Sequence, residues 1–228
     1  MSSDAACLIG SSTSSVVDTP VGADPLPDVE IGSAASALLL RWLADLFASP
    51  PTATSVRSLR NGLAMLDANG SDQSSEFSSG VESMFRCLSM DMDDEALAVF
   101  LSIAYGRLFL GIGGPETVPL CESFYRCDGR LFQAPAAEME RLLAAHNYSA
   151  AVKEPADHVS IELALLAILM EAHHPDRIVL NKRLMSWVPL LRDLLVRRDP
   201  TGFWSGAAAI LTSTIRLSAF RAGAFQST

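Results

Sequence analysis

The sequence is poor in basic residues and contains no paired-cysteine motif. Lys and Arg number 17 against 26 Asp and Glu, which gives a formal net charge of -9. Nucleic-acid binding needs a basic face that neutralises phosphates, so this balance argues against a nucleic-acid partner and favours a basic one. The four cysteines include no C-x-x-C pair, and a zinc knuckle or redox motif is therefore not expected. We interpret them as reduced thiols: Cys7, Cys87, Cys121 and Cys127.

Signals for export or membrane insertion are also missing. The first base is Arg41, so the N-terminus lacks the basic region of an export signal. No stretch of eighteen residues is apolar enough to span a bilayer. We therefore expect a cytoplasmic protein without stable membrane insertion.

The N-terminal segment differs in composition from the rest of the chain. Residues 1–30 are rich in Ser, Ala, Gly, Pro and Asp, and they contain five acids but no base. Such a segment buries too little apolar surface to offset the entropy of ordering. We expect a disordered acidic tail over residues 1–30 and one globular domain over residues 31–228.

The remaining sequence has the apolar spacing of helices, and no run alternates apolar and polar residues as a strand would. We predict an all-α domain of about nine helices. Breaks are expected at Ser49–Pro51, at Asn69–Gly70 and in the Gly111–Pro119 loop, whereas Pro189 kinks or divides a helix. The stretch 71–80 is interpreted as a loop or a short helix around Phe77. Residues 120–125 receive no assignment.

The most distinctive polar stretch is Glu154-Pro155-Ala156-Asp157-His158, which precedes a strongly apolar helix. Pro155 suits the first helical position, and Asp157 would then lie in the first turn, near the positive end of the helix dipole. Three interpretations stay open: a helix cap, an acid–base dyad, and an exposed carboxylate that binds a cation beside an imidazole. Neighbouring residues of a helix point about 100 degrees apart, and no partner nucleophile is apparent, which argues against the dyad.

Three other stretches contain residues that could belong to a binding or metal site. The glycines of the Gly111–Pro119 loop lack the Lys and Ser/Thr of a phosphate loop. Glu122 follows this loop in an apolar neighbourhood, where a carboxylate needs an internal donor or a bound cation. His173 and His174 are adjacent at a helix end, which is typical of residues that complement the helix dipole rather than of metal ligands. We predict neither a metal site nor a cofactor.

Two motifs in this order resemble the TorD/DmsD family of molybdoenzyme-specific chaperones. The first extends from Tyr105-Gly106-Arg107-Leu108-Phe109-Leu110-Gly111 to Pro119-Leu120-Cys121-Glu122-Ser123-Phe124-Tyr125, and the second is the Glu154–His158 stretch. The resemblance covers roughly residues 35–222. Cys121 stands where many members of the family have an aromatic residue.

The resemblance implies an all-helical cytoplasmic protein that binds the twin-arginine leader and the apo form of a molybdoenzyme catalytic subunit. It would assist cofactor insertion and prevent premature export, as a monomer or as a domain-swapped dimer that exchanges through residues 149–156. The resemblance assigns leader binding to Glu122, Tyr125, Glu154, Asp157 and His158. A surrounding groove or loop would contain Tyr105, Phe109, Gly111, Pro119 and Ser123.

The chemistry of such a ligand agrees with the composition. A leader with two arginines followed by an apolar segment needs carboxylates and an apolar groove.

Two alternatives to a leader-binding chaperone remain. One is an assembly chaperone, similar to the NarJ group, for a reductase subunit that is not exported. The other, from a different class, is a small helical enzyme that uses Asp157 and His158 as an acid–base pair.

Overall fold

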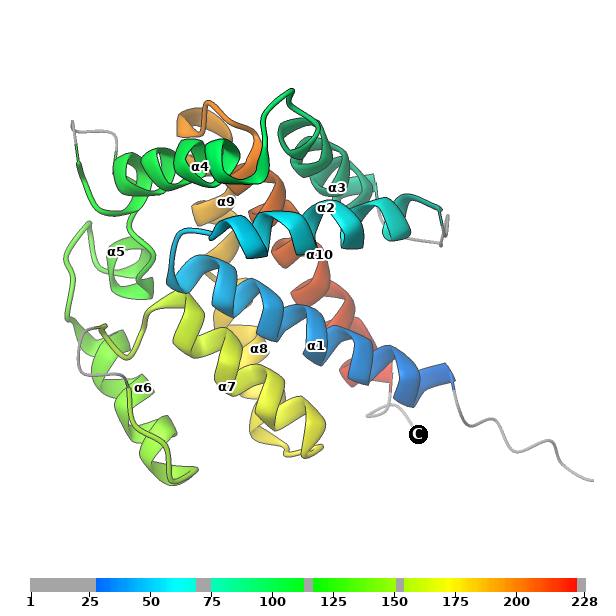
Figure 1. The fold of residues 1–228 in the computed structure, drawn as a ribbon. Helices are drawn as coiled ribbons and strands as arrows, with labels where there is room; N and C mark the ends of the chain where they lie inside the picture. Colours follow the sequence, from blue (N-terminus) through cyan, green and yellow to red (C-terminus); the bar gives the residue numbers. More distant parts are fainter. Residues whose placement is uncertain (1–27, 69–74, 113–116, 151–153, 225–228) are drawn as a thin grey trace, which may run out of the picture.

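A computed structural model describes residues 28–68, 75–112, 117–150 and 154–224 (Figure 1). Within these ranges the chain is helical and contains no strand, which confirms the all-α prediction. The expected tail over residues 1–27, part of the Gly111–Pro119 loop and residues 151–153 lie outside the described residues. The helices are α1 (Asp28–Ala48), α2 (Ala53–Ala68), α3 (Ser75–Leu88), α4 (Asp94–Phe109), α5 (Glu122–Arg126), α6 (Ala134–Ala145), α7 (Val159–Glu171), α8 (Asp176–Met185), α9 (Val188–Arg198) and α10 (Phe203–Ala224).

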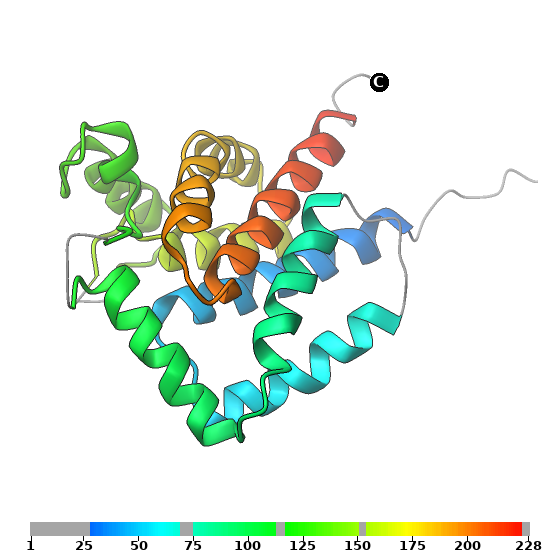
Figure 2. The ribbon, with the colours of Figure 1, turned by 90° about the horizontal axis from the view of Figure 1, so that it is seen from above.

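Two helix pairs form the centre of the molecule. Helices α1 and α7 lie side by side in Figure 1, and α3 packs along α10 in Figure 2. Leu163, Leu166 and Ala167 of α7 are fully buried, because this helix is apolar on nearly all sides. The largest fully buried side chains come from several helices and join in one core: Phe47, Met84, Leu97, Leu101, Met139, Trp187, Phe203 and Trp204.

Helices α3 and α10 approach each other to backbone contact. A Cβ atom at Gly80 would lie 2.7 Å from the carbonyl oxygen of Gly206, and one at Gly206 would lie 2.6 Å from that of Gly80. Only glycine fits at such a crossing, since any side chain would force the two helices apart.

Most helix boundaries follow the sequence signals. Asp93 is the N-cap of α4 and accepts a hydrogen bond from the backbone N–H of Ala96 at 2.7 Å. Pro189 lies in the first turn of α9, so it divides α8 from α9 instead of kinking one helix. Phe77 belongs to α3, and Glu122 opens the short helix α5, which the sequence did not predict. Asp28 to Glu30, assigned to the tail from composition, belong to α1.

The start of α7 was predicted too early. The helix begins at Val159 with His158 as its N-cap, so Pro155 is not its first residue and Asp157 is not in its first turn. The reason is tertiary. The Val159 N–H donates to the carbonyl of Leu120, and the Glu122 N–H donates to the carbonyl of Asp157, so the chain before α7 is held as a bridge to the chain before α5.

None of the described helices is long and apolar enough to cross a bilayer.

Candidate functional site

The two sequence motifs that carry the resemblance meet in space. Cys121 and His158 form an isolated antiparallel bridge, with hydrogen bonds of 2.7 Å (Val159 N–H to Leu120) and 3.0 Å (Glu122 N–H to Asp157). This bridge lies at the N-terminal ends of both α5 and α7. Residues more than thirty positions apart thus form one site.

Asp157 is fully buried at this bridge, which corrects the idea of an exposed carboxylate. Its Oδ2 accepts hydrogen bonds from the backbone N–H of Ser123 at 2.8 Å and from the Ser123 hydroxyl at 2.5 Å. The Ser123 hydroxyl also accepts from the Gln133 N–H at 3.2 Å. Asp157 therefore caps α5 and fixes the chain that leads into α7. An incoming guanidinium does not reach it in this conformation.

His158 is neutral in the folded protein. Burial lowers the pKa of its imidazole to about 4, although the negative charge of Asp157 opposes that shift. Its Nδ1 accepts from the Ser160 backbone N–H at 3.3 Å and lies 2.7 Å from the Ser160 hydroxyl, which leaves the proton on Nε2. Nε2 lies 3.9 Å from a carboxylate oxygen of Glu154, but a neutral ring forms no ion pair there.

Glu154 is the exposed acid of the site. Its side chain is 47% exposed, and among the described residues no Lys or Arg side chain forms an ion pair with it. A carboxylate in this state is free to accept a guanidinium. Of the predicted leader-binding acids it is the one that solvent reaches.

Glu122 was expected to have either an internal hydrogen-bond donor or a bound cation, and the structure shows internal donors. Its fully buried carboxylate accepts a hydrogen bond from Arg126 Nη1 at 2.6 Å and forms an ion pair with Arg183 Nη2 of α8. Arg183 also reaches Glu138 of α6 at 2.9 Å. The result is a partly buried ionic cluster that joins α5, α6 and α8.

A second buried acid, Glu162, belongs to the same cluster. Its Oε1 lies 3.8 Å from Arg183 Nε, and its Oε2 accepts from Trp187 Nε1 at 3.3 Å. Burial, together with the nearby charge of Glu122, raises the pKa of Glu162 well above its usual value. The charged form of Glu162 is therefore disfavoured beside Glu122, and Arg183 lies within ion-pair distance of both acids.

Tyr125 and Pro119 line this cluster on its apolar side. The Tyr125 hydroxyl donates to the Pro119 carbonyl at 2.8 Å, and its ring stacks on Trp187 with centroids 5.5 Å apart. Burial raises the pKa of this phenol. Gly111 adopts a φ of +69°, which favours glycine at the start of the predicted loop.

Tyr105 and Phe109 lie in an aromatic cluster of the core rather than on an open groove. Their rings are 5.0 Å apart, and each contacts Trp204, at 5.3 and 5.2 Å respectively. The Tyr105 hydroxyl donates to the Phe47 carbonyl at 3.1 Å. These residues support the end of α1 and the base of the loop.

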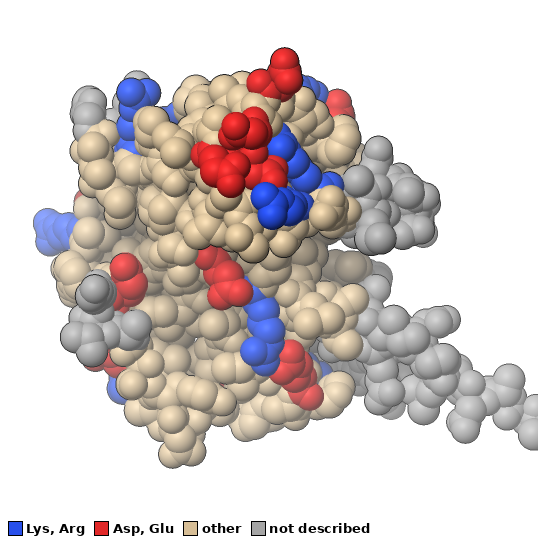
Figure 3. All heavy atoms as spheres, in the orientation of Figure 1, with Lys and Arg blue, Asp and Glu red and all other residues tan. Residues whose placement is uncertain are grey.

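An apolar groove of about 620 Å³ runs between α1 and α2. Its size lies within the usual range of ligand pockets. Asp45 is the charged residue on its wall, and its apolar part is formed by Leu39, Trp42, Leu46, Leu59, Phe77 and Ile210. On the face shown in Figure 3, charged side chains gather in a few groups with uncharged surface between them.

The sequence missed Glu162, Arg183 and Trp187 as members of the site. Glu162 carried a signal, since it is the one acid in the apolar run 159–170, four residues after His158. Arg183 and Trp187 carried none. They come from α8 and the turn before α9, and only the packing of those helices against α7 and α5 brings them there.

The chain is similar to known proteins over most of its length. Residues 74–193, more than half of the chain, match the profile of the family described as nitrate reductase delta subunit. A chaperone protein TorD from Aliivibrio fischeri is 25% identical over 191 residues, which cover 77% of this chain and 89% of that protein. A chaperone protein TorD from a Psychrobacter species is 28% identical over 178 residues, covering 70% and 78% respectively.

A solved structure of a candidate redox enzyme maturation protein from Archaeoglobus fulgidus is 16% identical and covers 85% of this chain and 97% of that one. Its TM-score of 0.43 is too low to support an argument. The match over residues 74–193 shows the family. The chain belongs to the nitrate reductase delta subunit and TorD family, whose members are chaperones and not enzymes.

Proposed function

We propose that this protein acts in the cytoplasm as the chaperone of a molybdenum-cofactor oxidoreductase and binds the twin-arginine leader of its apo catalytic subunit. The observation that carries this proposal is the exposed carboxylate of Glu154 at the point where the two family motifs meet. A guanidinium of the leader pairs with Glu154, because a charged bidentate donor matches a carboxylate.

The other predicted residues divide into contacts and supports. His158 presents its Nε2–H beside Glu154, where it can donate to a backbone carbonyl of the leader. Asp157 and Ser123 hold the loop, and Glu122 with Tyr125 forms its inner wall. The apolar segment of the leader then occupies the groove between α1 and α2, in which Trp42 is half-buried.

Calorimetric titration of the full chain with leader peptides tests this function. We expect micromolar binding of a twin-arginine leader and weaker binding of its Lys-Lys counterpart. Glu154→Gln should weaken the Arg-Arg leader roughly five- to tenfold, as loss of about 1 kcal/mol predicts. Glu140→Gln, which removes one exposed charge on α6, serves as the matched control and should leave the affinity unchanged.

Other outcomes have distinct meanings. Equal losses in Glu154→Gln and Glu140→Gln would indicate attraction to net charge alone and would reject the Glu154 assignment. Unchanged binding in Trp42→Ala would remove the groove from the leader site. Failure of every leader to bind would reject leader recognition and favour a non-exported reductase subunit as the client, the alternative that the description of the matching family supports.

A further inference from the structure

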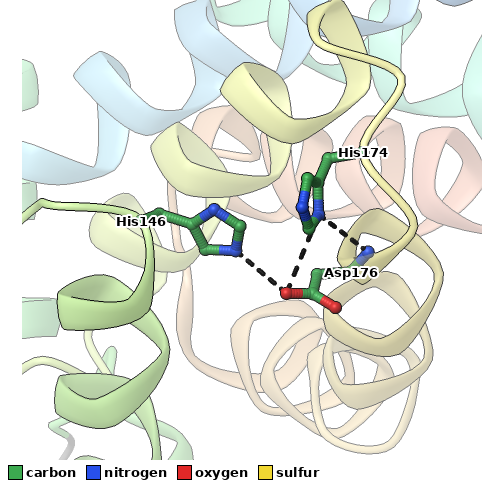
Figure 4. Close-up of side chains that lie close together, drawn as sticks. All are labelled: His146, His174 and Asp176. Carbon is green, nitrogen blue, oxygen red and sulfur yellow. Dashed lines mark hydrogen bonds and ion pairs between the residues drawn. The ribbon is translucent and has the colours of Figure 1, made fainter.

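A second polar cluster lies away from the leader site, at the end of α6. His146 is the C-cap of α6, His174 belongs to the connection between α7 and α8, and Asp176 opens α8. Figure 4 shows the Asp176 carboxylate directed toward both imidazoles. Asp176 Oδ2 lies 2.9 Å from His146 Nε2 and 3.7 Å from His174 Nδ1.

These three donors have the spacing of metal ligands. One ligand atom from each residue lies within 4.8 Å of the other two. Tetrahedral zinc with bonds of about 2.0–2.1 Å places its ligand atoms roughly 3.3 Å apart. The observed 2.9 and 3.7 Å lie on either side of that separation, so small side-chain rotations suffice to bind an ion.

The hydrogen bonds show that no proton lies between His174 Nδ1 and the Asp176 carboxylate. The Asp176 backbone N–H donates to His174 Nδ1 at 3.2 Å, which makes Nδ1 an acceptor. The carboxylate oxygen at 3.7 Å is an acceptor as well. Two acceptors that face each other repel. A cation bound to both removes that repulsion and replaces the hydrogen bond from the Asp176 N–H at the single lone pair of Nδ1. On the other side, a metal would replace the proton that His146 Nε2 donates to the carboxylate.

The backbone around the cluster is already fixed. The His174 N–H donates to the Leu169 carbonyl at 2.9 Å, and the preceding His173 has a φ of +51°, which turns the chain back. Arg177 donates to the His173 carbonyl at 2.7 Å. The ring of His146 packs edge-on against His174 with centroids 4.6 Å apart. Ligands held in this way lose little entropy when an ion binds.

The donor set selects the kind of ion. Two imidazoles and one carboxylate suit zinc and its first-row neighbours, whereas magnesium and calcium prefer oxygen ligands. Side-chain exposures of 14% for His146, 43% for His174 and 38% for Asp176 leave the cluster open to solvent. Water can therefore supply the fourth ligand.

We propose that His146, His174 and Asp176 form a Zn²⁺ site that joins the C-terminal end of α6 to the connection between α7 and α8. In the sequence, only His173 and His174 are adjacent, and that pair did not predict a metal site. His146 is 28 residues before His174, and the fold brings the two together. This site is independent of leader binding.

Titration of the full chain without a histidine tag tests the site. By calorimetry we expect one equivalent of Zn²⁺ to bind with a micromolar or lower dissociation constant. His146→Gln and His174→Gln should each weaken binding at least tenfold. His173→Asn is the matched control, since it removes a neighbouring exposed imidazole and Asn tolerates the left-handed backbone. Its affinity should equal that of the wild type.

Two measurements on the unaltered chain guard against misfolded variants and thiol binding. Among the four histidines, the ring signals of His146 and His174 should shift with Zn²⁺ in NMR spectra, and those of His158 and His173 should not. Co²⁺ should give ligand-field absorption without a thiolate charge-transfer band. The proposal is overturned if Zn²⁺ does not bind, if binding survives in His146→Gln, or if a thiolate band shows that cysteines hold the ion.

Discussion

The buried imidazole of His158 makes folding depend on pH. Its pKa is about 4 in the folded protein, against 6.5 in an exposed histidine, so the unfolded chain takes up the proton first as pH falls. The contribution to stability is full above pH 6.5 and is lost as pH falls toward 4. His158→Asn keeps an N-cap acceptor but does not titrate.

We therefore predict that the unfolding free energy of the wild type falls relative to that of His158→Asn, by roughly 3 kcal/mol between pH 7 and pH 4. Urea unfolding of both proteins at the two pH values measures this difference. Parallel pH profiles would show that the ring is not buried as a neutral group.

Asp157 has a structural effect that the sequence did not reveal. Asp157→Asn replaces a charged acceptor of two hydrogen bonds from Ser123, and we predict a loss of about 2 kcal/mol in unfolding free energy. Asp128→Asn is the control, because Asp128 is exposed with a φ of +51° that Asn accepts readily.

Combining Asp157→Asn with Ser123→Ala should give less than the sum of the two losses, since both remove one interaction. Additive losses in urea unfolding would contradict the proposed link between α5 and the chain before α7.

At the scale of elements, one arginine joins three helices. Arg183→Met leaves the buried carboxylate of Glu122 with Arg126 alone, and we predict a loss of about 3–5 kcal/mol. Glu162→Gln should change stability by less than about 1 kcal/mol, because burial raises the pKa of Glu162 and so disfavours its charged form. Equally large losses for both variants would mean that Glu162 is ionised.

The crossing of α3 and α10 gives a second test at this scale. Gly206→Ala places a Cβ atom 2.6 Å from the Gly80 carbonyl oxygen, and we predict a loss of about 1–3 kcal/mol as the helices separate. Gly62→Ala in α2 meets no atom within 4 Å and should stabilise the protein by about 0.5–1 kcal/mol. Thermal unfolding of the two variants should therefore shift in opposite directions.

At the scale of the whole molecule, ligand binding adds to stability. A leader at one hundred times its dissociation constant should raise the unfolding free energy by about 2.7 kcal/mol. We predict that the shift in melting temperature persists when residues 1–27 are removed, because the proposed contacts all lie in later residues. Loss of the shift in the shortened chain would place part of the leader site in the N-terminal segment.

The helices were predictable because their signals are local. Apolar spacing, the Asp93 cap and Pro189 act within a few residues, so the all-α fold and most boundaries follow from the sequence. The early start predicted for α7 had a local signal too, in Pro155. It was wrong because hydrogen bonds to Leu120 and Glu122, more than thirty residues away, decide where the chain turns helical.

The sequence by itself determined the helical architecture, the family through two spaced motifs, and the residue types that meet at the proposed leader site. Only the tertiary structure decided their states: Asp157 buried, Glu154 exposed, the pKa of Glu162 raised, and His146 beside His174. The physical reason is that burial, charge pairing and ligand distance depend on which helices pack together. Those contacts join residues that no local pattern connects.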